Sequence, residues 1–272
     1  MNTTAVPSTT SPSPVLFLGH GSPMNAIEDN TWSRTWRALG TRLPRPRAIL
    51  CVSAHWETPG PWLTGTEAPS TIHDFGGFPQ ALFDVRYPAP GDPALAQRIV
   101  ELLGDADARI DPGRGLDHGA WGVLGPMYPD ADVPIVQLGI DSRRPGAWHV
   151  ALARRLAPLR DEGVMVVASG DIVHNLRLFD WRDPVPLPWA LRFRDRVNAL
   201  VRDGDLDALA DWPSLGEDAR LSIPTAEHYL PLLYALALAR DGDAIEFFNN
   251  DVIGSLSMTS LLIGHAQRHE DA

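Results

Sequence analysis

Short apolar runs that end at or near a histidine are the feature of this sequence that most restricts its fold. Residues 15–20 (Val-Leu-Phe-Leu-Gly-His) and 48–55 (Ala-Ile-Leu-Cys-Val-Ser-Ala-His) are two such runs. A third, 163–169, is followed closely by His174. Runs of this length and composition are typical of strands that are buried on both faces. The sequence therefore predicts several buried strands, each of which delivers an imidazole near its carboxyl end.

Segments with helical spacing alternate with these strands. This alternation predicts an α/β fold, a single domain with a central, largely parallel or mixed sheet flanked by helices. Ligands of such folds bind outside the carboxyl ends of the strands. Residues 59–92 are rich in proline and glycine and are expected to be largely irregular, which in a compact domain usually marks a functional loop. Further strands are expected at 133–140 and 255–263, and helices at 30–40 (capped by Asn30 or Thr31), 93–103, 148–159, 188–210 and 226–238.

The composition excludes several chemistries. All 23 basic residues are arginines, so the chain has no lysine for a Schiff base or for a Walker-A phosphate loop. A single cysteine, Cys51, excludes a disulfide framework, an iron–sulfur cluster and a four-cysteine zinc site. A net charge of −11 argues against nucleic acid as a partner.

The chain also shows no sign of a membrane or a secretory role. No stretch approaches the roughly 20 apolar residues of a membrane span. The first residues lack the charged and apolar regions of a secretory signal. These features predict a cytoplasmic protein with polar tails at residues 1–14, expected to be disordered, and at 265–272.

Nine histidines are the main candidates for chemistry. His149 lies in a helical pattern, and His265 and His269 lie in the C-terminal tail, so these three are expected to be solvated surface residues. The other six are His20, His55, His73, His118, His174 and His228. Each alone could be a hydrogen-bonded structural residue, but a buried cluster of imidazoles costs desolvation that a metal ion commonly compensates. Imidazole and carboxylate ligands suit Zn, Fe(II), Mn or Ni.

At these positions the chain resembles the DODA-type branch of the class III extradiol ring-cleaving dioxygenases, in the LigB-like superfamily. The resemblance runs from Leu16 to Gly264. It is carried, in order, by residues 16–24 (LFLGHGSPM), 52–56 (VSAHW), 71–79 (TIHDFGGFP), 116–122 (LDHGAWG), 168–175 (ASGDIVHN), 227–231 (EHYLP) and 254–258 (GSLSM).

The resemblance implies a catalytic domain over residues 15–264 that opens a catechol beside its two hydroxyls, using O₂ and a non-haem Fe(II). It implies that His20 and His55 are metal ligands, that His228 is the third ligand, and that His174 is a fourth ligand or an acid/base. His118 matches an acid/base beside the metal. Glu227 adjoins His228, and the sequence leaves open which of the two faces the metal. Zn(II) can occupy such a site in place of iron.

Aromatic and basic residues near the site are candidates for substrate binding. His73, Phe75, Phe78 and Trp121 could form walls for a planar ring, although ordinary core packing is an equally good interpretation of Trp121. Arg177, three residues after His174, could bind a substrate carboxylate, with a surface ion pair as the alternative.

Two other functions fit the same histidines. A zinc-dependent hydrolase would need three ligands and a general base, for which Glu57 or Glu227 could serve. A non-enzymatic metal-binding relative, of the Memo type within the same superfamily, would need no acid/base. The identity of the catechol (DOPA, caffeate or another) and the oligomeric state stay open.

Overall fold

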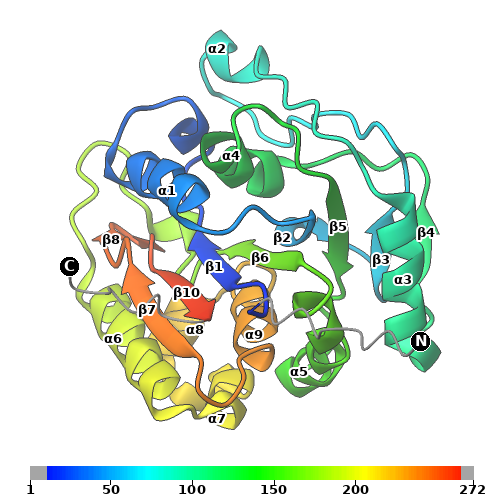
Figure 1. Ribbon diagram of the computed structural model, residues 1–272. Coiled ribbons are helices and arrows are strands. Elements are labelled where there is room, and N and C mark those ends of the chain that lie inside the picture. Colours follow the sequence, from blue (N-terminus) through cyan, green and yellow to red (C-terminus); the bar gives the residue numbers. More distant parts are fainter. Residues whose placement is uncertain (1–10, 265–272) are drawn as a thin grey trace, which may run out of the picture.

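The computed structural model describes residues 11–264, and a mixed sheet of eight strands runs through its centre (Figure 1). The strand order is β4-β3-β5-β2-β6-β1-β10-β7. The four central strands, β5, β2, β6 and β1, are parallel, and β10 and β7 extend one edge in antiparallel fashion. The bounds of these strands are β1 Val15–Gly19, β2 Ala48–Glu57, β3 Trp62–Thr64, β4 Arg109–Asp111, β5 Ile135–Ile140, β6 Val164–Gly170, β7 Ala244–Phe248 and β10 Ser260–Gly264.

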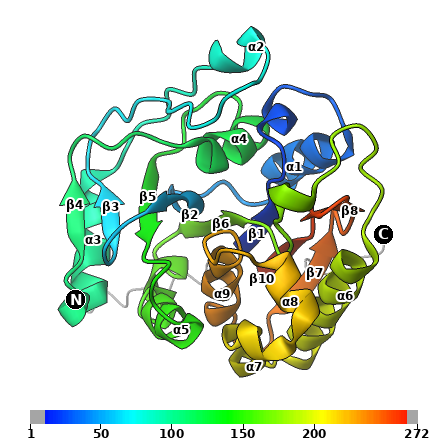
Figure 2. The same cartoon turned by 180° about the vertical axis from the view of Figure 1, so that it is seen from behind.

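Helices cover both faces of the sheet (Figures 1 and 2). The α-helices are α1 Thr31–Arg42, α2 Gln80–Phe83, α3 Pro93–Leu103, α4 His118–Met127, α5 Gly146–Arg154, α6 Pro188–Asp203, α7 Leu206–Ala210, α8 Glu217–Ser222 and α9 Leu230–Ala237. A short hairpin of β8 (Val252–Ile253) and β9 (Leu256–Ser257) lies outside the main sheet. No helix in residues 11–264 combines the length and apolarity that a membrane crossing requires.

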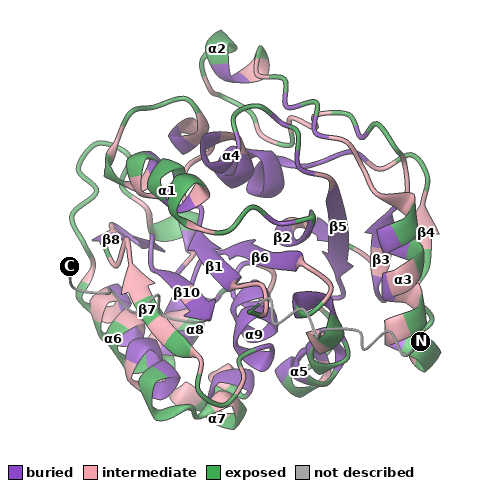
Figure 3. Cartoon of the chain, in the orientation of Figure 1, coloured by how far each residue is buried: buried purple, intermediate pink, exposed green. Residues whose placement is uncertain are grey.

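Alternate residues of each central strand enter two separate cores. In β1, Val15 and Phe17 pack with α5, α6 and α9, whereas Leu16 and Leu18 pack on the other face with α1 and α4. Figure 3 shows the central strands as buried along their length. Burial on both faces explains why these strands read as continuous apolar runs. The predicted α/β fold with helices on both faces is confirmed.

Several predicted elements differ from the structure in extent. The expected strand at 255–263 is two strands, β9 and β10, and the expected helix at 148–159 begins and ends earlier, as α5. The helix predicted at 30–40 is confirmed, and Asn30 caps it together with Ser33. Residues 59–92 are irregular apart from β3 and α2. Helix α4 was not expected, because all of its residues but Gly125 are buried and it has no polar face to produce helical periodicity.

Of the predicted tails, residues 1–10 and 265–272, with His265 and His269, lie outside the described part of the chain. In residues 11–14, Ser13 exchanges two hydrogen bonds with Arg160. Its backbone N–H donates to the Arg160 carbonyl and its carbonyl accepts from Arg160 Nε, each at 2.8 Å.

Candidate active site

A turn at the carboxyl end of β1 places His20. Gly21 has a φ of +57°, which disfavours any side chain, and a Cβ there would lie 2.3 Å from the Met258 sulfur. The His20 backbone N–H donates to the Gly170 carbonyl at the end of β6, at 3.2 Å. The Gly21 N–H donates to Asp171 Oδ1 at 3.1 Å. The His20 side chain is thereby held between the ends of two adjacent strands.

Strands β2 and β6 bring His55 and His174 to the same edge, and the segment before α9 brings His228 there. His55 lies near the end of β2, and His174 follows β6. His228 approaches because Gly170 has no side chain: a Cβ there would lie 2.2 Å from the His228 carbonyl oxygen. That carbonyl instead accepts from the Asp171 N–H at 2.8 Å. Residues far apart in the sequence therefore meet where the fold rule for open α/β sheets places a ligand.

His118 is the first residue of α4. Asp117 caps the helix by accepting from the Ala120 N–H at 3.2 Å, and it also accepts from Ser53 Oγ of β2 at 2.7 Å. The His118 N–H donates to Asp74 Oδ1 at 3.0 Å. The cap and this contact hold the ring over the site at the helix N-terminus.

Five imidazoles form one cluster. Ring centroids of His20, His55 and His228 are 4.9–5.3 Å apart. The His118 ring lies 3.9 Å from that of His55, and the His174 ring stacks on that of His228 at 3.4 Å and 5°. Ligand atoms of His20, His55 and His228 all lie within 4.8 Å of one another, so these three could hold a metal ion.

The rings of His20, His55 and His228 are oriented in the same way. In each, Nδ1 contacts a protein side chain and Nε2 faces the centre of the cluster. Nε2 of His20 and Nε2 of His55 are 3.1 Å apart. Nε2 of His228 is buried and has no hydrogen-bond partner among the described residues. The Nδ1 partners are Ser169 Oγ for His20 (3.0 Å), Asp74 Oδ2 for His55 (3.4 Å) and Glu227 Oε1 for His228 (3.0 Å).

Burial keeps these histidines neutral at neutral pH. It lowers the pKa of His55 to about 3, with the neighbouring His118 adding to the effect. It also lowers the pKa of His174 to about 4, helped by His55. Burial followed by repulsion from other imidazoles holds the pKa of His20 and of His228 well below the usual value. The neutral imidazole is the form that binds a metal.

Two aspartates, Asp171 and Asp74, also belong to the site, and neither could be singled out from the sequence. Burial raises the pKa of Asp171. Its Oδ2 lies 3.5 Å from His20 Nε2 and has no hydrogen-bond partner among residues 11–264. Two further groups could hold a metal: Asp171 with His174 and His228, and Asp74 with His55 and His118. Burial opposes ionisation of Asp74, but hydrogen bonding and charge from His118 outweigh it and lower the pKa of Asp74 to about 2. The only signal for either aspartate was its place beside a histidine in 71–79 or 168–175.

The two candidate glutamates, Glu227 and Glu57, lie in different surroundings. Glu227 accepts from Thr225 Oγ1 at 2.8 Å and contacts His228 Nδ1, so its Oε1 serves that ring. Glu57 is exposed at the end of β2 and bonds to Ser142. Neither glutamate belongs to the donor groups found within the described part of the chain.

An aromatic wall adjoins His118. The Phe75 ring lies 5.4 Å from His118, and the His73 ring lies 5.6 Å from Trp121. Trp121 is 1% exposed, and its indole N–H donates to the Ile72 carbonyl at 2.8 Å. Phe78 and Phe83 extend the wall beside Phe75, at 5.5 and 5.1 Å. Phe83 could not be singled out from the sequence, because it belongs to the short helix α2.

One expectation about a polar residue needs correction. His149 is fully buried rather than solvated, because α5 packs against α9 and places this ring between Tyr234 and the Asp141 carbonyl. Arg177 is exposed, and no ion pair joins it to another residue between 11 and 264.

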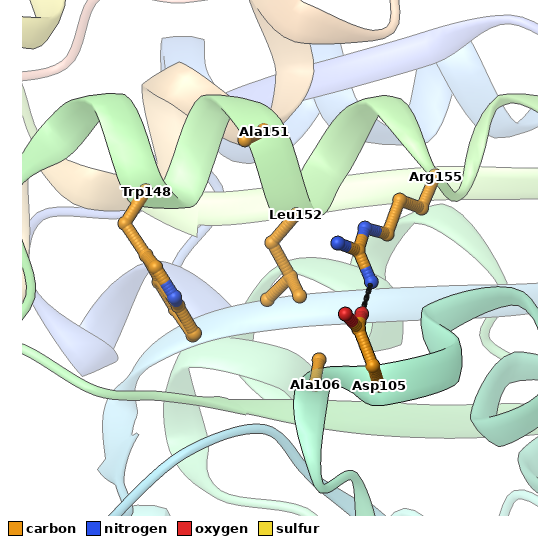
Figure 4. A pocket seen from close by; sticks show the side chains of 6 residues that line it. All are labelled: Asp105, Ala106, Trp148, Ala151, Leu152 and Arg155. Atoms are coloured by element: carbon orange, nitrogen blue, oxygen red, sulfur yellow. Dashed lines mark hydrogen bonds and ion pairs between the residues drawn. The ribbon is translucent and has the colours of Figure 1, made fainter.

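A surface pocket of about 210 Å³ lies elsewhere, between α5 and the turn that follows α3 (Figure 4). Asp105 and Arg155 form an ion pair of 2.5 Å across it, beside Trp148. Its lining includes none of the clustered histidines. The pocket is therefore separate from the site described above.

Known proteins that contain a similar sequence are aromatic ring-opening dioxygenases. Residues 13–253 match the family model for the catalytic LigB subunit of aromatic ring-opening dioxygenase. The 4,5-DOPA dioxygenase extradiol of Escherichia coli (strain K12) is 55% identical over 92% of this chain and 94% of its own length. The protein of the same name from Beta vulgaris is 37% identical over 88% and 92%.

A solved structure agrees with these matches. The crystal structure of the uncharacterized protein JW3007 from Escherichia coli K12 has a TM-score of 0.82 and 48% identity, and the match covers 93% of this chain and 100% of that one. LigB dioxygenases depend on a metal, and the histidine cluster could bind one. The chain belongs to the LigB family and is an extradiol, aromatic ring-opening dioxygenase that acts with O₂ on a small molecule.

Proposed function

We propose that this dioxygenase uses Fe(II) held by His20, His55 and His228 to open a DOPA-like or caffeate-like catechol. The observation that carries the proposal is the convergence of three imidazoles whose ligand atoms lie within 4.8 Å of one another. Each ring has a partner at Nδ1, which holds its orientation as expected of a metal ligand. The carboxylates beside His55 and His228 also favour the proton on Nδ1, because a carboxylate only accepts. The relatives named 4,5-DOPA dioxygenase support the substrate class.

The donor set fits an iron ion. The buried Nε2 of His228 has no hydrogen-bond partner among the described residues, and a bound cation would satisfy it. Neutral imidazoles suit Fe(II) as well as Zn(II). When bound, Fe(II) supplies positive charge that favours ionisation of a catechol hydroxyl, together with positions for the catecholate and O₂. His174, stacked on His228, is assigned as a further ligand or as an acid/base.

Proton transfer is assigned to His118 and His174. One catechol hydroxyl must lose its proton for the ring to react, and a proton must be returned as the ring opens. An imidazole is suited to both tasks near neutral pH. His118 at the start of α4 and His174 beyond β6 flank the central rings, on the sides of His55 and His228 respectively. Each is expected to contribute on the order of 10²–10⁴ in rate.

Substrate binding is assigned to the aromatic wall and to Arg177. His73 and Phe75 give a planar ring an edge on which to stack, with Phe75 in contact with His118. Trp121, which is buried, supports this wall by packing against the His73 ring. Arg177 is exposed in the segment after His174 and has no ion-pair partner among residues 11–264. An exposed guanidinium without such a partner is available to bind the carboxylate of DOPA or caffeate.

The test is to load the protein with Fe(II) under anaerobic conditions, add DOPA or caffeate, and then admit O₂ while recording visible absorbance and O₂ uptake. We expect a yellow ring-opened product with one O₂ consumed per catechol, and no reaction from the zinc form. A hydrolase would instead act with zinc and without O₂. Absence of colour and of O₂ uptake across a panel of catechols would refute the proposal.

A further inference from the structure

Asp74 occupies a special place in the cluster, because its one carboxylate contacts two of the assigned histidines. Asp74 Oδ1 lies 3.0 Å from His118 Nδ1, and Oδ2 lies 3.4 Å from His55 Nδ1. Oδ1 also accepts from the His118 backbone N–H at 3.0 Å. A ligand ring and an acid/base ring therefore share one anionic partner.

The loop that carries Asp74 is held on both sides. On one side, the Ile72 N–H donates to the Leu116 carbonyl at 2.8 Å, and the Ile72 carbonyl accepts from Trp121 Nε1 at 2.8 Å. The His73 ring contacts the Val85 carbonyl at 3.1 Å, and on the other side the Phe75 ring packs edge-on against His118. These contacts define the position of a side chain that is itself 22% exposed.

The direction of these contacts limits what the two rings can do. The two Nδ1 contacts are close charge contacts at 3.0 and 3.4 Å and not aligned hydrogen bonds. A carboxylate oxygen placed beside Nδ1 still favours the tautomer with the proton on that nitrogen, because a carboxylate accepts and does not donate. That leaves Nε2 of His55 as the nitrogen for the metal, and Nε2 of His118 as the nitrogen that exchanges a proton with substrate. Partners of this kind to metal-ligand histidines typically change metal affinity or activity by 10–100-fold when removed.

We propose that Asp74 is a positioning residue that holds the His55 and His118 rings together in their Nδ1–H tautomers and so aligns His118 for proton transfer. The proposal rests on the roles assigned above to His55 and His118. Asp74 also forms a group with His55 and His118 whose ligand atoms lie within 4.8 Å of one another. Its oxygens contact Nδ1 atoms and not the converging Nε2 atoms of His20 and His55, so we assign it a positioning role and not a place among the ligands. Asp74 acts on the reaction only through the rings that it holds.

The first test is kinetic and uses Asp74→Asn, which keeps the size of the side chain but replaces one acceptor oxygen with a donor. We expect kcat to fall by about 10–100-fold, with KM within about 3-fold and full metal content at saturating metal. Asp84→Asn is the matched control, since Asp84 lies exposed on the same segment and, among residues 11–264, hydrogen-bonds only to Gln80 and Leu82 of the adjoining helix. That control is expected to leave kcat unchanged.

A double-mutant cycle separates positioning from a general structural effect. If Asp74 acts through His118, Asp74→Asn should change kcat by less than about 3-fold in a His118→Ala background. A full additional loss in that background, or a loss of metal from Asp74→Asn at saturation, would overturn the proposal. Unchanged kcat in the single variant would do so too.

A measurement that needs no turnover keeps this inference distinct from the proposed function. Two-bond ¹⁵N–¹H NMR correlations of labelled histidines read the tautomer of each ring in the zinc-loaded protein. We expect His118 in the Nδ1–H form in the parent and a mixture of forms in Asp74→Asn. The same tautomers in both proteins would refute the positioning role, whether or not any catechol is cleaved. Thermal unfolding of the same samples checks that the fold is retained.

Discussion

Replacing His149 with glutamine should remove an acid-sensitive element of the fold. His149 is fully buried between α5 and α9. Its Nε2 must carry the proton, because it contacts the Asp141 carbonyl, which can only accept, at 3.1 Å. Nδ1 then accepts from the Tyr234 hydroxyl at 3.0 Å. Both ring nitrogens are thus used in the neutral form, and a second proton on Nδ1 would oppose the tyrosine O–H.

The magnitude follows from the pKa of this ring. Burial lowers the pKa of His149 from 6.5 to about 4, against a smaller opposing effect of the Asp141 carbonyl. The unfolded chain therefore binds a proton more readily than the native one, and the native state loses stability as pH falls below about 6.5. At about 1.4 kcal/mol per pKa unit, the full loss approaches roughly 3 kcal/mol. About 1.4 kcal/mol of it is reached by about pH 5.5 and about 2.5 kcal/mol by about pH 4.5.

Urea unfolding followed by tryptophan fluorescence measures this effect in the parent and in His149→Gln, with the same metal content in both. Glutamine can still donate to a carbonyl and accept from a hydroxyl, but it does not titrate. We expect the parent to lose about 2.5 kcal/mol more than the variant between about pH 7 and about pH 4.5. His149→Phe serves as a second variant if glutamine fits poorly. Parallel loss of stability in parent and variants would show that His149 is not the acid-sensitive group.

Three further predictions concern the site and the packing around it. His118→Ala should keep full metal content while kcat falls by about 10²–10⁴, whereas His20→Ala should fail to retain metal after dialysis; metal analysis and O₂ uptake distinguish the two. Gly21→Ala places a β-carbon on a residue with φ of +57° and should destabilise the protein by about 1–2 kcal/mol in urea unfolding. Arg160→Met should destabilise it by about 3–5 kcal/mol, because the Asp243 carboxylate that it leaves unpaired is only 8% exposed; an unchanged urea midpoint would refute this.

The sequence predicts the central strands well, for a physical reason. β1, β2, β5 and β6 are buried on both faces, so each appears as an uninterrupted apolar run. Their order in the chain and the carboxyl-end rule then place His20, His55 and His174 at one edge. By contrast α4 carries Gly119, Gly122, Gly125 and Pro126, which ordinarily indicate a loop, and its burial removes the polar face that would identify a helix.

The partners of the site residues are what the sequence could not show. Ser169 contacts His20 across 149 positions of sequence, and His118 contacts Asp74 across 44. Apart from their place in segments 71–79 and 168–175, nothing local distinguishes Asp74 and Ser169 from any other aspartate or serine. The burial of His149 could not be predicted from the sequence either. Its helical pattern allows the ring to lie on the exposed or on the buried face of α5, and the packing of Tyr234 from α9 determines that it is buried.

Neutrality of the histidine cluster follows from the fold before any metal is considered. The rings lie at the end of a sheet with a core on each face. Charging His20, His55, His174 or His228 therefore costs desolvation and brings a positive charge to within 3.4–5.9 Å of other imidazoles. Asp74 and Glu227 contact Nδ1 atoms and not the converging Nε2 atoms. Asp171 is the carboxyl group that lies near the centre, 3.5 Å from His20 Nε2, and burial raises its pKa and so favours its neutral form. Neutral imidazole ligands would not neutralise a divalent cation bound there, so the cation would attract an anionic ligand such as a catecholate. Substitutions that bring a carboxylate to the centre should therefore weaken catecholate binding even where they strengthen metal binding.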